Sequence, residues 1–198
     1  MNTDFSLSIL CYPYHPSKHT GRGHDRYVAE LVDNLASQRK DVRLQVVDHG
    51  FSKSVLQGGL KLPRQVSDLL RARADVYHAI SPVGGATAAL LSKRPLVVTI
   101  HDVIPFNVSG SYDSPIKYRI WRQCIRLCLK RAAAIIVPYH VTKDELVTRL
   151  GADPAKVHVV NYGVDHNTYF QRPSVERARR CVLYVGEVSR SKGVELLI

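Results

Sequence analysis

The pair His101–Asp102 closes an apolar run in the segment TIHDVIP, residues 99–105. An imidazole beside a carboxylate can accept or hold a proton, and together the two groups can bind sugar-like hydroxyls. A second histidine, His78, lies inside the apolar run VYHAI at 76–80 and is expected to be a core residue. His101 could also be a histidine whose hydrogen bonds are satisfied by neighbouring backbone, but the adjacent Asp102 and the strand-end position favour a functional role.

A glycine-rich stretch, GRGHDRY at residues 21–27, precedes a helical pattern. The dinucleotide fingerprint needs G-x-G-x-x-G directly after a strand. Here Arg26 occupies the third glycine position, and several residues separate the stretch from the apolar run before it, so a nicotinamide site is disfavoured. Bare backbone at Gly23, beside a helix start, favours a phosphate or sugar contact. For Gly21 an ordinary loop glycine explains the residue equally well.

Short, β-branched apolar runs recur along the chain, at 6–12, 42–48, 76–80, 96–102, 133–139, 156–162 and 181–187. Most are apolar throughout, which is typical of strands buried on both faces of a parallel sheet. Helical patterns fill the gaps and predict an α/β fold with a doubly wound, Rossmann-like parallel sheet. Ligands bind such sheets at the carboxyl ends of the strands, which also draws attention to His15 after the first run.

Three helical patterns carry most of the local signals. The first, at 25–38, places Tyr27, Val28, Leu31 and Leu35 on one face. The second spans 115–131 and begins with a proline, which suits a first helical position. In the third, Thr142 and Glu145 have the spacing of a capping box, and Gly151 marks the end.

The chain divides by composition near residue 170. Residues 1–170 hold the predicted sheet, whereas 171–198 begin as a polar, basic linker and continue into a new apolar run at 181–187. We therefore expect a second domain to begin here and to be truncated. Arg190 and Lys192 follow this run; a lysine there can contact a diphosphate, or can be an exposed loop residue.

The formal net charge is +11, from 28 Lys and Arg against 17 Asp and Glu. Such a surface attracts nucleic acid, anionic lipid or phosphorylated small molecules. On 115–131 the cations Arg119, Arg122, Arg126 and Lys130 share one face, and Ile116, Ile120, Cys124 and Leu127 form an apolar stripe. This helix is either a peripheral contact with anionic membrane or a solvated outer face.

No apolar run approaches the roughly 20 residues of a membrane span, and the start of the chain is a poor signal peptide. The expected location is cytoplasmic, with association at the inner face of a membrane as an option. The four cysteines include no C-x-x-C pair, which predicts buried thiols rather than a metal or redox site.

Five segments resemble, in order and spacing, those of the family-4 glycosyltransferases of the two-domain GT-B fold. They are GRGHDRYVAEL at 21–31, TIHDVIP at 99–105, IIVPYHVTKDEL at 135–146, VVNYGVD at 159–165 and VLYVGEVSRSKGVELLI at 182–198. The resemblance implies an N-terminal, acceptor-side domain over 1–170 and the start of a nucleotide-sugar-binding domain after it.

The same resemblance implies a hexosyl-type transfer, with retention, from a nucleotide-sugar to a glycan, lipid-linked or small-molecule acceptor. It implies no metal and no cofactor beyond the nucleotide-sugar itself. His101 and Asp102 would be catalytic, and Lys192 and Arg190 would hold the donor diphosphate. Substrate-binding roles would fall to His15, Gly21, Gly23, Arg26 and Tyr139.

Because the donor half would lie beyond residue 198, the chain alone is expected to be inactive. The alternative hypothesis is a basic α/β module that binds nucleic acid or anionic membrane. Aromatic and basic residues cluster only at 115–131, so no nucleic-acid partner is expected.

Overall fold

The computed structural model describes residues 5–11, 23–48, 66–72, 74–107, 115–171, 182–186, 188 and 193–196. The chain forms two compact units, Met1–Asn161 and Tyr162–Ile198. The first unit contains the sheet and its helices, and the second contains the segment that follows. Each unit is described by itself below.

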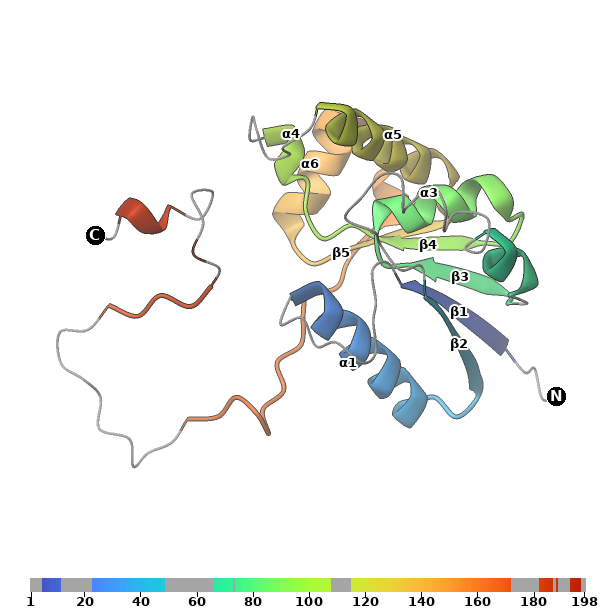
Figure 1. The fold of residues 1–198 in the computed structure, drawn as a ribbon, viewed down its shortest axis with the longest axis horizontal. Helices are drawn as coiled ribbons and strands as arrows, with labels where there is room; N and C mark the ends of the chain where they lie inside the picture. Colours follow the sequence, from blue (N-terminus) through green and yellow to red (C-terminus); the bar gives the residue numbers. More distant parts are fainter. Residues whose placement is uncertain are drawn as a thin grey trace. The chain divides into compact units, whose positions relative to one another are not determined.

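Six parallel strands form one sheet in the first unit (Figure 1), in the order β2-β1-β3-β4-β5-β6. Their bounds are Phe5–Cys11 (β1), Val42–Asp48 (β2), Val76–Ala79 (β3), Leu96–Thr99 (β4), Ala134–Val137 (β5) and Val157–Val159 (β6). Each strand coincides with a predicted apolar run, although most strands end sooner than their runs. The doubly wound, Rossmann-like parallel sheet is therefore confirmed.

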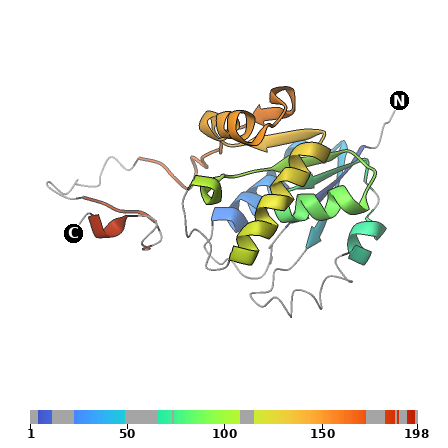
Figure 2. The same cartoon turned by 90° about the horizontal axis from the view of Figure 1, so that it is seen from above.

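Besides a helical stretch at 66–71, the helices of the first unit are α1 (Gly23–Gln38), α3 (Pro82–Leu91), α4 (Ile104–Asn107), α5 (Pro115–Arg131) and α6 (His140–Leu150), with a 3-10 turn, η1, at Pro154–Lys156. α1 links β1 to β2, whereas α3, α5 and α6 step across the sheet in the opposite direction. Because parallel crossovers are right-handed, the two sets cover opposite faces. Figure 1 shows α1 beside β1 and β2, and α3 and α5 lie side by side in Figure 2.

The core reflects these two faces. The larger cluster joins the sheet to α3, α5 and α6, and its fully enclosed side chains include Val98, Ile125, Ile135 and Leu146. A separate cluster joins Val28 of α1 to Ile80, with Tyr27, Leu31 and Leu35 against it. The predicted apolar face of the first helix is thus confirmed.

The ends of α6 and α1 test the predicted helix-capping and helix-end residues. α6 ends at Gly151, whose φ of 69° lies in the left-handed region that glycine adopts without strain. Its predicted capping box is wrong, because the helix begins at His140 and no side chain caps it. Thr142 is instead a buried residue inside the helix. α1 begins at Gly23, so this glycine is the first helical residue rather than part of the preceding loop.

Gly85 is a point of close packing between α3 and its neighbours. A Cβ at this position would lie 2.8 Å from Sγ of Cys128 on α5 and 2.9 Å from Cγ2 of Val98 on β4. We expect Gly85→Ala to lower the free energy of unfolding by about 1–3 kcal/mol through overpacking. Urea denaturation measures this. Gly23→Ala, whose Cβ meets nothing within 4 Å, is the control; equal effects of both changes would contradict the close packing.

The predicted apolar stripe of the helix at 115–131 is partly wrong. Ile116 and Ile120 are 70% and 55% exposed, whereas Ile125, Cys128 and Leu129 are buried. The second half of the stripe does pack inward, because Cys124 and Leu127 are partly buried against the core cluster, and the neighbouring Cys128 meets α3 at Gly85.

In the second unit, the predicted strand at 181–187 is also wrong. Residues 182–186 are not in a strand, and Val182, Leu183 and Val185 are more than 80% exposed. No strand pairs with them among the described residues, so nothing satisfies their backbone as a sheet would. A turn held by Asp165, which accepts hydrogen bonds from the Asn167 amide and the Thr168 hydroxyl, and a 3-10 turn at Val194–Leu196 are the local structures described.

Candidate functional site at the carboxyl ends of β3 and β4

His101 lies just beyond the end of β4, where its side chain is half-buried. Its Nε2 is 3.1 Å from the carbonyl oxygen of Ile80, which follows β3. Because a carbonyl only accepts, this hydrogen bond puts the proton on Nε2 and the acceptor lone pair of neutral imidazole on Nδ1. The ring of Tyr27 meets the imidazole edge-on, with centroids 5.0 Å apart and planes at 85°. Two elements therefore fix the ring's position.

A chain of hydrogen-bonded polar side chains, formed by His78, Thr99 and Tyr27, adjoins this arrangement. Nε2 of His78 is 2.8 Å from Oγ1 of Thr99, and the hydroxyl of Tyr27 reaches the same Oγ1 at 3.5 Å. The polar chain thus links β3, β4 and α1, and it shares Tyr27 with the ring contact to His101. A satisfied polar network of this kind fixes the relative positions of the elements that carry it.

His78 is 6% exposed, and burial lowers its pKa from 6.5 to about 4. It is therefore neutral at physiological pH and acts as a hydrogen-bonding core residue. The expectation of a core histidine is confirmed.

Asp102 is exposed, and its Oδ1 accepts a hydrogen bond from the backbone N–H of Ile104 at 3.1 Å. One carboxylate oxygen therefore caps the short helix α4. The carboxylate remains at the surface beside His101 in sequence, where it can also meet a polar ligand.

The start of α1 contributes Gly23 and Arg26 to the same edge of the sheet as Tyr27. Gly23 is exposed, with open space around it, and its amide is among the first of the helix. Arg26 forms an exposed pair with Glu30 at 3.4 Å, a geometry that adds little stability. Tyr139, which follows β5, is 49% exposed at the first turn of α6.

Four candidate residues lie outside the described part of the structure. They are His15 and Gly21, near the glycine-rich stretch, and Arg190 and Lys192, near the end of the chain. Their roles stay predictions.

Sequence reasoning did not place Tyr27 and Thr99 at the site. Tyr27 was predicted only as a core-facing residue of its helix, yet its ring and hydroxyl both meet polar groups. Thr99 lies two residues before His101, and strand periodicity puts such residues on one face. The two-residue spacing between Thr99 and His101 was therefore the sequence signal that could have identified Thr99.

The described residues bring no three His, Cys, Asp or Glu side chains into a metal-binding group, and they include no helix that could span a membrane. Cys124 and Cys128 are thiols rather than disulfides. Burial raises the pKa of Cys128 to about 12, and its Sγ donates to the carbonyl of Pro82 at 3.3 Å. For these two cysteines a packing role in α5 is the fitting explanation.

Comparison with known proteins identifies a family whose model matches most of the chain. A family model described as Glycosyltransferase Family 4 matches residues 20–168. The sulfoquinovosyl transferase SQD2 of Arabidopsis thaliana is 26% identical over 149 residues, which is 68% of this chain and 29% of that protein. The alpha-maltose-1-phosphate synthase of Mycolicibacterium smegmatis is 26% identical over 140 residues, which is 63% of this chain and 36% of that protein. The chain spans about a third of the length of these relatives.

The solved structure of Anabaena HepE (Alr3699), in complex with UDP and glucose, has a similar fold. The TM-score is 0.57 at 17% sequence identity, covering 86% of this chain and 47% of that one. The sheet described above is the Rossmann-like half of a GT-B architecture.

Proposed function

Because the chain belongs to glycosyltransferase family 4, we propose that the full-length protein transfers a hexosyl group from a nucleotide-sugar to an acceptor, with retention at the anomeric carbon. The observation that carries the proposal is the imidazole of His101, held at the carboxyl end of the sheet by Ile80 and Tyr27. This is the edge where doubly wound sheets bind their ligands.

The reaction breaks the bond between the anomeric carbon and a diphosphate oxygen and forms one to an acceptor oxygen on the same face of the sugar, while the acceptor hydroxyl's proton leaves with the nucleoside diphosphate. His101 contacts the donor sugar at the reacting centre through a ring whose orientation is fixed before binding. Asp102, exposed beside it, receives hydrogen bonds from acceptor hydroxyls.

Substrate groups also meet the start of α1 and of α6. The exposed backbone at Gly23 lets a sugar or phosphate approach the first amides of α1 closely. Arg26 and Tyr139, both exposed, border the same edge of the sheet. His15 and Gly21 complete this acceptor side in the proposal.

The donor is proposed to be a nucleoside diphosphate hexose. HepE was solved with UDP and glucose, and two relatives carry names of sugar-transferring or sugar-phosphate-forming enzymes. Lys192 and Arg190 neutralise the leaving diphosphate, so that protein cations serve where a metal would otherwise be needed. Since the chain covers 47% of the HepE chain, transfer is proposed to require the second half of the fold, and residues 1–198 alone are proposed to be inactive.

The test is incubation of the full-length protein with UDP-glucose and other nucleotide-hexoses, each with glycan, lipid-linked and small-molecule acceptors. Nucleotide release and the coupling constant of the product's anomeric proton are measured. Transfer with the donor's anomeric configuration is the expected result. An inverted product would overturn retention, and no transfer from any donor to any acceptor class would overturn the proposed function.

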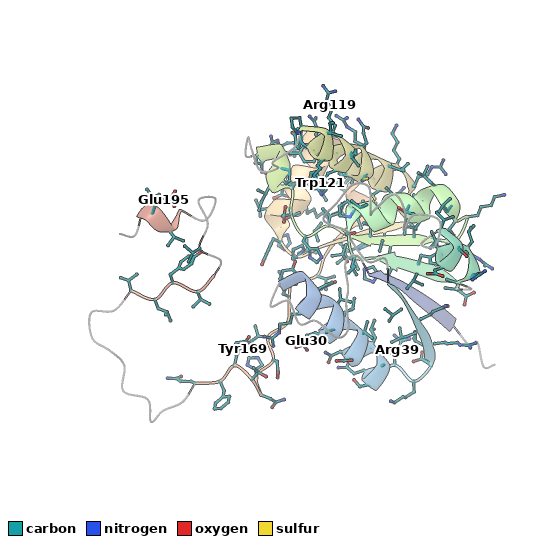
Figure 3. The ribbon with its side chains drawn as sticks, in the orientation of Figure 1. Glu30, Arg39, Arg119, Trp121, Tyr169 and Glu195 are labelled. Carbon is teal, nitrogen blue, oxygen red and sulfur yellow. The ribbon has the colours of Figure 1, made fainter. Side chains whose placement is uncertain are left out.

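A second candidate role, peripheral contact with an anionic membrane through α5, is favoured by one observation. Ile116 and Ile120, one turn apart, are exposed beside the exposed cations Lys117 and Arg119. In Figure 3 Arg119 projects outward from α5. The helix carries six cations and no acidic residue, which suits a lipid surface at the inner face of a membrane.

The double change Lys117→Gln and Arg119→Gln is expected to weaken binding of the full-length protein to phosphatidylglycerol vesicles about tenfold or more, at about 1 kcal/mol per cation. Vesicle sedimentation measures it, and neutral phosphatidylcholine vesicles show the background. The matched control, Lys40→Gln with Arg43→Gln, removes the same charge from exposed positions near β2. Equal weakening by both pairs would mean that net charge, rather than α5, governs binding.

A further inference from the structure

A cavity of about 250 Å³ lies between α4, α5 and α6. Phe106 of α4, Tyr118 and Arg122 of α5, and Glu145 and Arg149 of α6 line it. None of these residues belongs to the strand-end site. The volume lies just below the roughly 300–1,000 Å³ of typical small-molecule pockets, so an occupant must be small.

Arg122 forms one wall and is held without an ion pair among the described residues. Its Cζ lies 5.1 Å from the ring centroid of Phe106 and 5.4 Å from that of Tyr118, so the guanidinium is stacked on both rings. Its Nε is buried, and no described residue forms a hydrogen bond with it. A buried donor of this kind is costly unless a ligand or water completes it. The prediction that Arg122 belongs to an exposed basic face is therefore wrong.

The lining also includes a hydrogen-bonded carboxylate, that of Glu145. Oε1 of Glu145 accepts from Nδ2 of Asn107 at 2.5 Å and from Nη1 of Arg149 at 3.4 Å, and Arg149 also donates to Oδ1 of Asn107. Both bonds to Glu145 use one oxygen, which leaves Oε2 without a protein partner within the described part of the chain. Glu145 and Arg122 thus line one cavity without pairing with each other.

We propose that this cavity binds a small hydroxylated anion, such as a polyol phosphate. The anionic group bonds to the guanidinium of Arg122, which lines the cavity, and a ligand hydroxyl donates to Oε2 of Glu145. With two arginines against one glutamate, the lining carries one net positive charge, which favours an anion over a neutral polyol. This site is independent of the proposed sugar transfer.

Trp121 offers a local signal of binding, because its ring centroid lies 5.3 Å from that of Phe106. The full-length protein is labelled with fluorotryptophan, and its Trp121 resonance is identified by its loss in Trp121→Phe. Glycerol 1-phosphate, inorganic phosphate and glycerol are titrated at constant ionic strength. A saturable shift is expected with both phosphates, at lower concentration for glycerol 1-phosphate, and none with glycerol.

The matched variants are Arg122→Gln and Arg126→Gln, each of which removes one positive charge, at positions one turn apart on α5. Arg122→Gln is expected to raise the Kd for glycerol 1-phosphate at least tenfold, whereas Arg126→Gln, at an exposed position, leaves it within twofold. Arg122→Lys, which keeps the charge but lacks the planar guanidinium that lies over both rings, is expected to weaken binding similarly and covers the case in which Arg122→Gln fails to fold.

Three results would overturn the proposal. They are no saturable shift with either phosphate, equal weakening by the Arg122 and Arg126 changes, and a shift with glycerol as large as with glycerol 1-phosphate. Equal affinities for phosphate and glycerol 1-phosphate would overturn the role of Glu145. Because the readout is binding at Trp121, failure of sugar transfer leaves these outcomes unaffected.

Discussion

Replacing His101 with alanine in the full-length protein is expected to lower kcat/KM for sugar transfer by about 100- to 1,000-fold, the usual cost of removing one preorganised hydrogen-bonding group from a reacting centre. The imidazole is held by the Ile80 carbonyl and the Tyr27 ring before substrate arrives, so its contribution carries no cost of reorientation. Steady-state rates of nucleotide release measure the effect.

Two variants separate chemistry from folding. His158→Ala removes an exposed histidine from β6 and is expected to leave kcat/KM unchanged. His101→Gln keeps an N–H that can donate to the Ile80 carbonyl, so it preserves the strand-end contact while lacking the imidazole. If His101→Ala retains more than half of the wild-type kcat/KM, the assignment of His101 to the reacting centre is wrong.

The second large effect concerns stability at acid pH. Burial lowers the pKa of His78 to about 4 in the folded protein, against 6.5 for the ordinary side chain. Between these two pH values the unfolded chain binds the proton that the folded chain excludes. The free energy of unfolding therefore falls as pH falls from about 6.5 to 4, by roughly 3 kcal/mol for this residue, and its contribution is constant above 6.5.

Urea denaturation across this pH range tests the prediction. His78→Gln cannot take up a charge but can still bond to Thr99, so it should lose that part of the pH dependence. The exposed His158→Gln should keep it. The same slope in wild type and His78→Gln would show that other groups govern acid stability.

The sheet could be predicted from sequence because its strands are buried on both faces. Such strands appear as continuous apolar runs, and six of the seven runs formed strands in the expected parallel sheet. The run at 181–187 has the same composition, but the described residues in it are exposed and unpaired. An apolar run becomes a strand only where a neighbouring strand satisfies its backbone.

The orientation of α5 could not be predicted because periodicity gives the angles between side chains but not the partner of each face. The partner is α3, whose Gly85 admits Cys128, and this contact turns Ile116 and Ile120 outward. The same rotation carries Arg122 between two aromatic rings. That contact joins α4 to α5, and no local pattern encodes it.

The position of the candidate site residues in the fold was predictable in part, whereas their roles stay predictions. The strand-end position of His101 followed from the fold class. The residues that hold its ring in place, however, lie on elements distant from it in sequence. Tyr27 approaches from α1 and Ile80 from the end of β3. Asp102 was expected to be catalytic, which stays a prediction, and the structure adds that its carboxylate caps α4.

The most direct measurement of the central claim is a crystal structure of the full-length protein with a nucleotide-sugar donor. The account predicts that the sugar ring lies within hydrogen-bonding distance of the His101 imidazole, at the carboxyl ends of β3 and β4. A donor sugar bound away from that edge, with His101 still bonded only to protein, would contradict it.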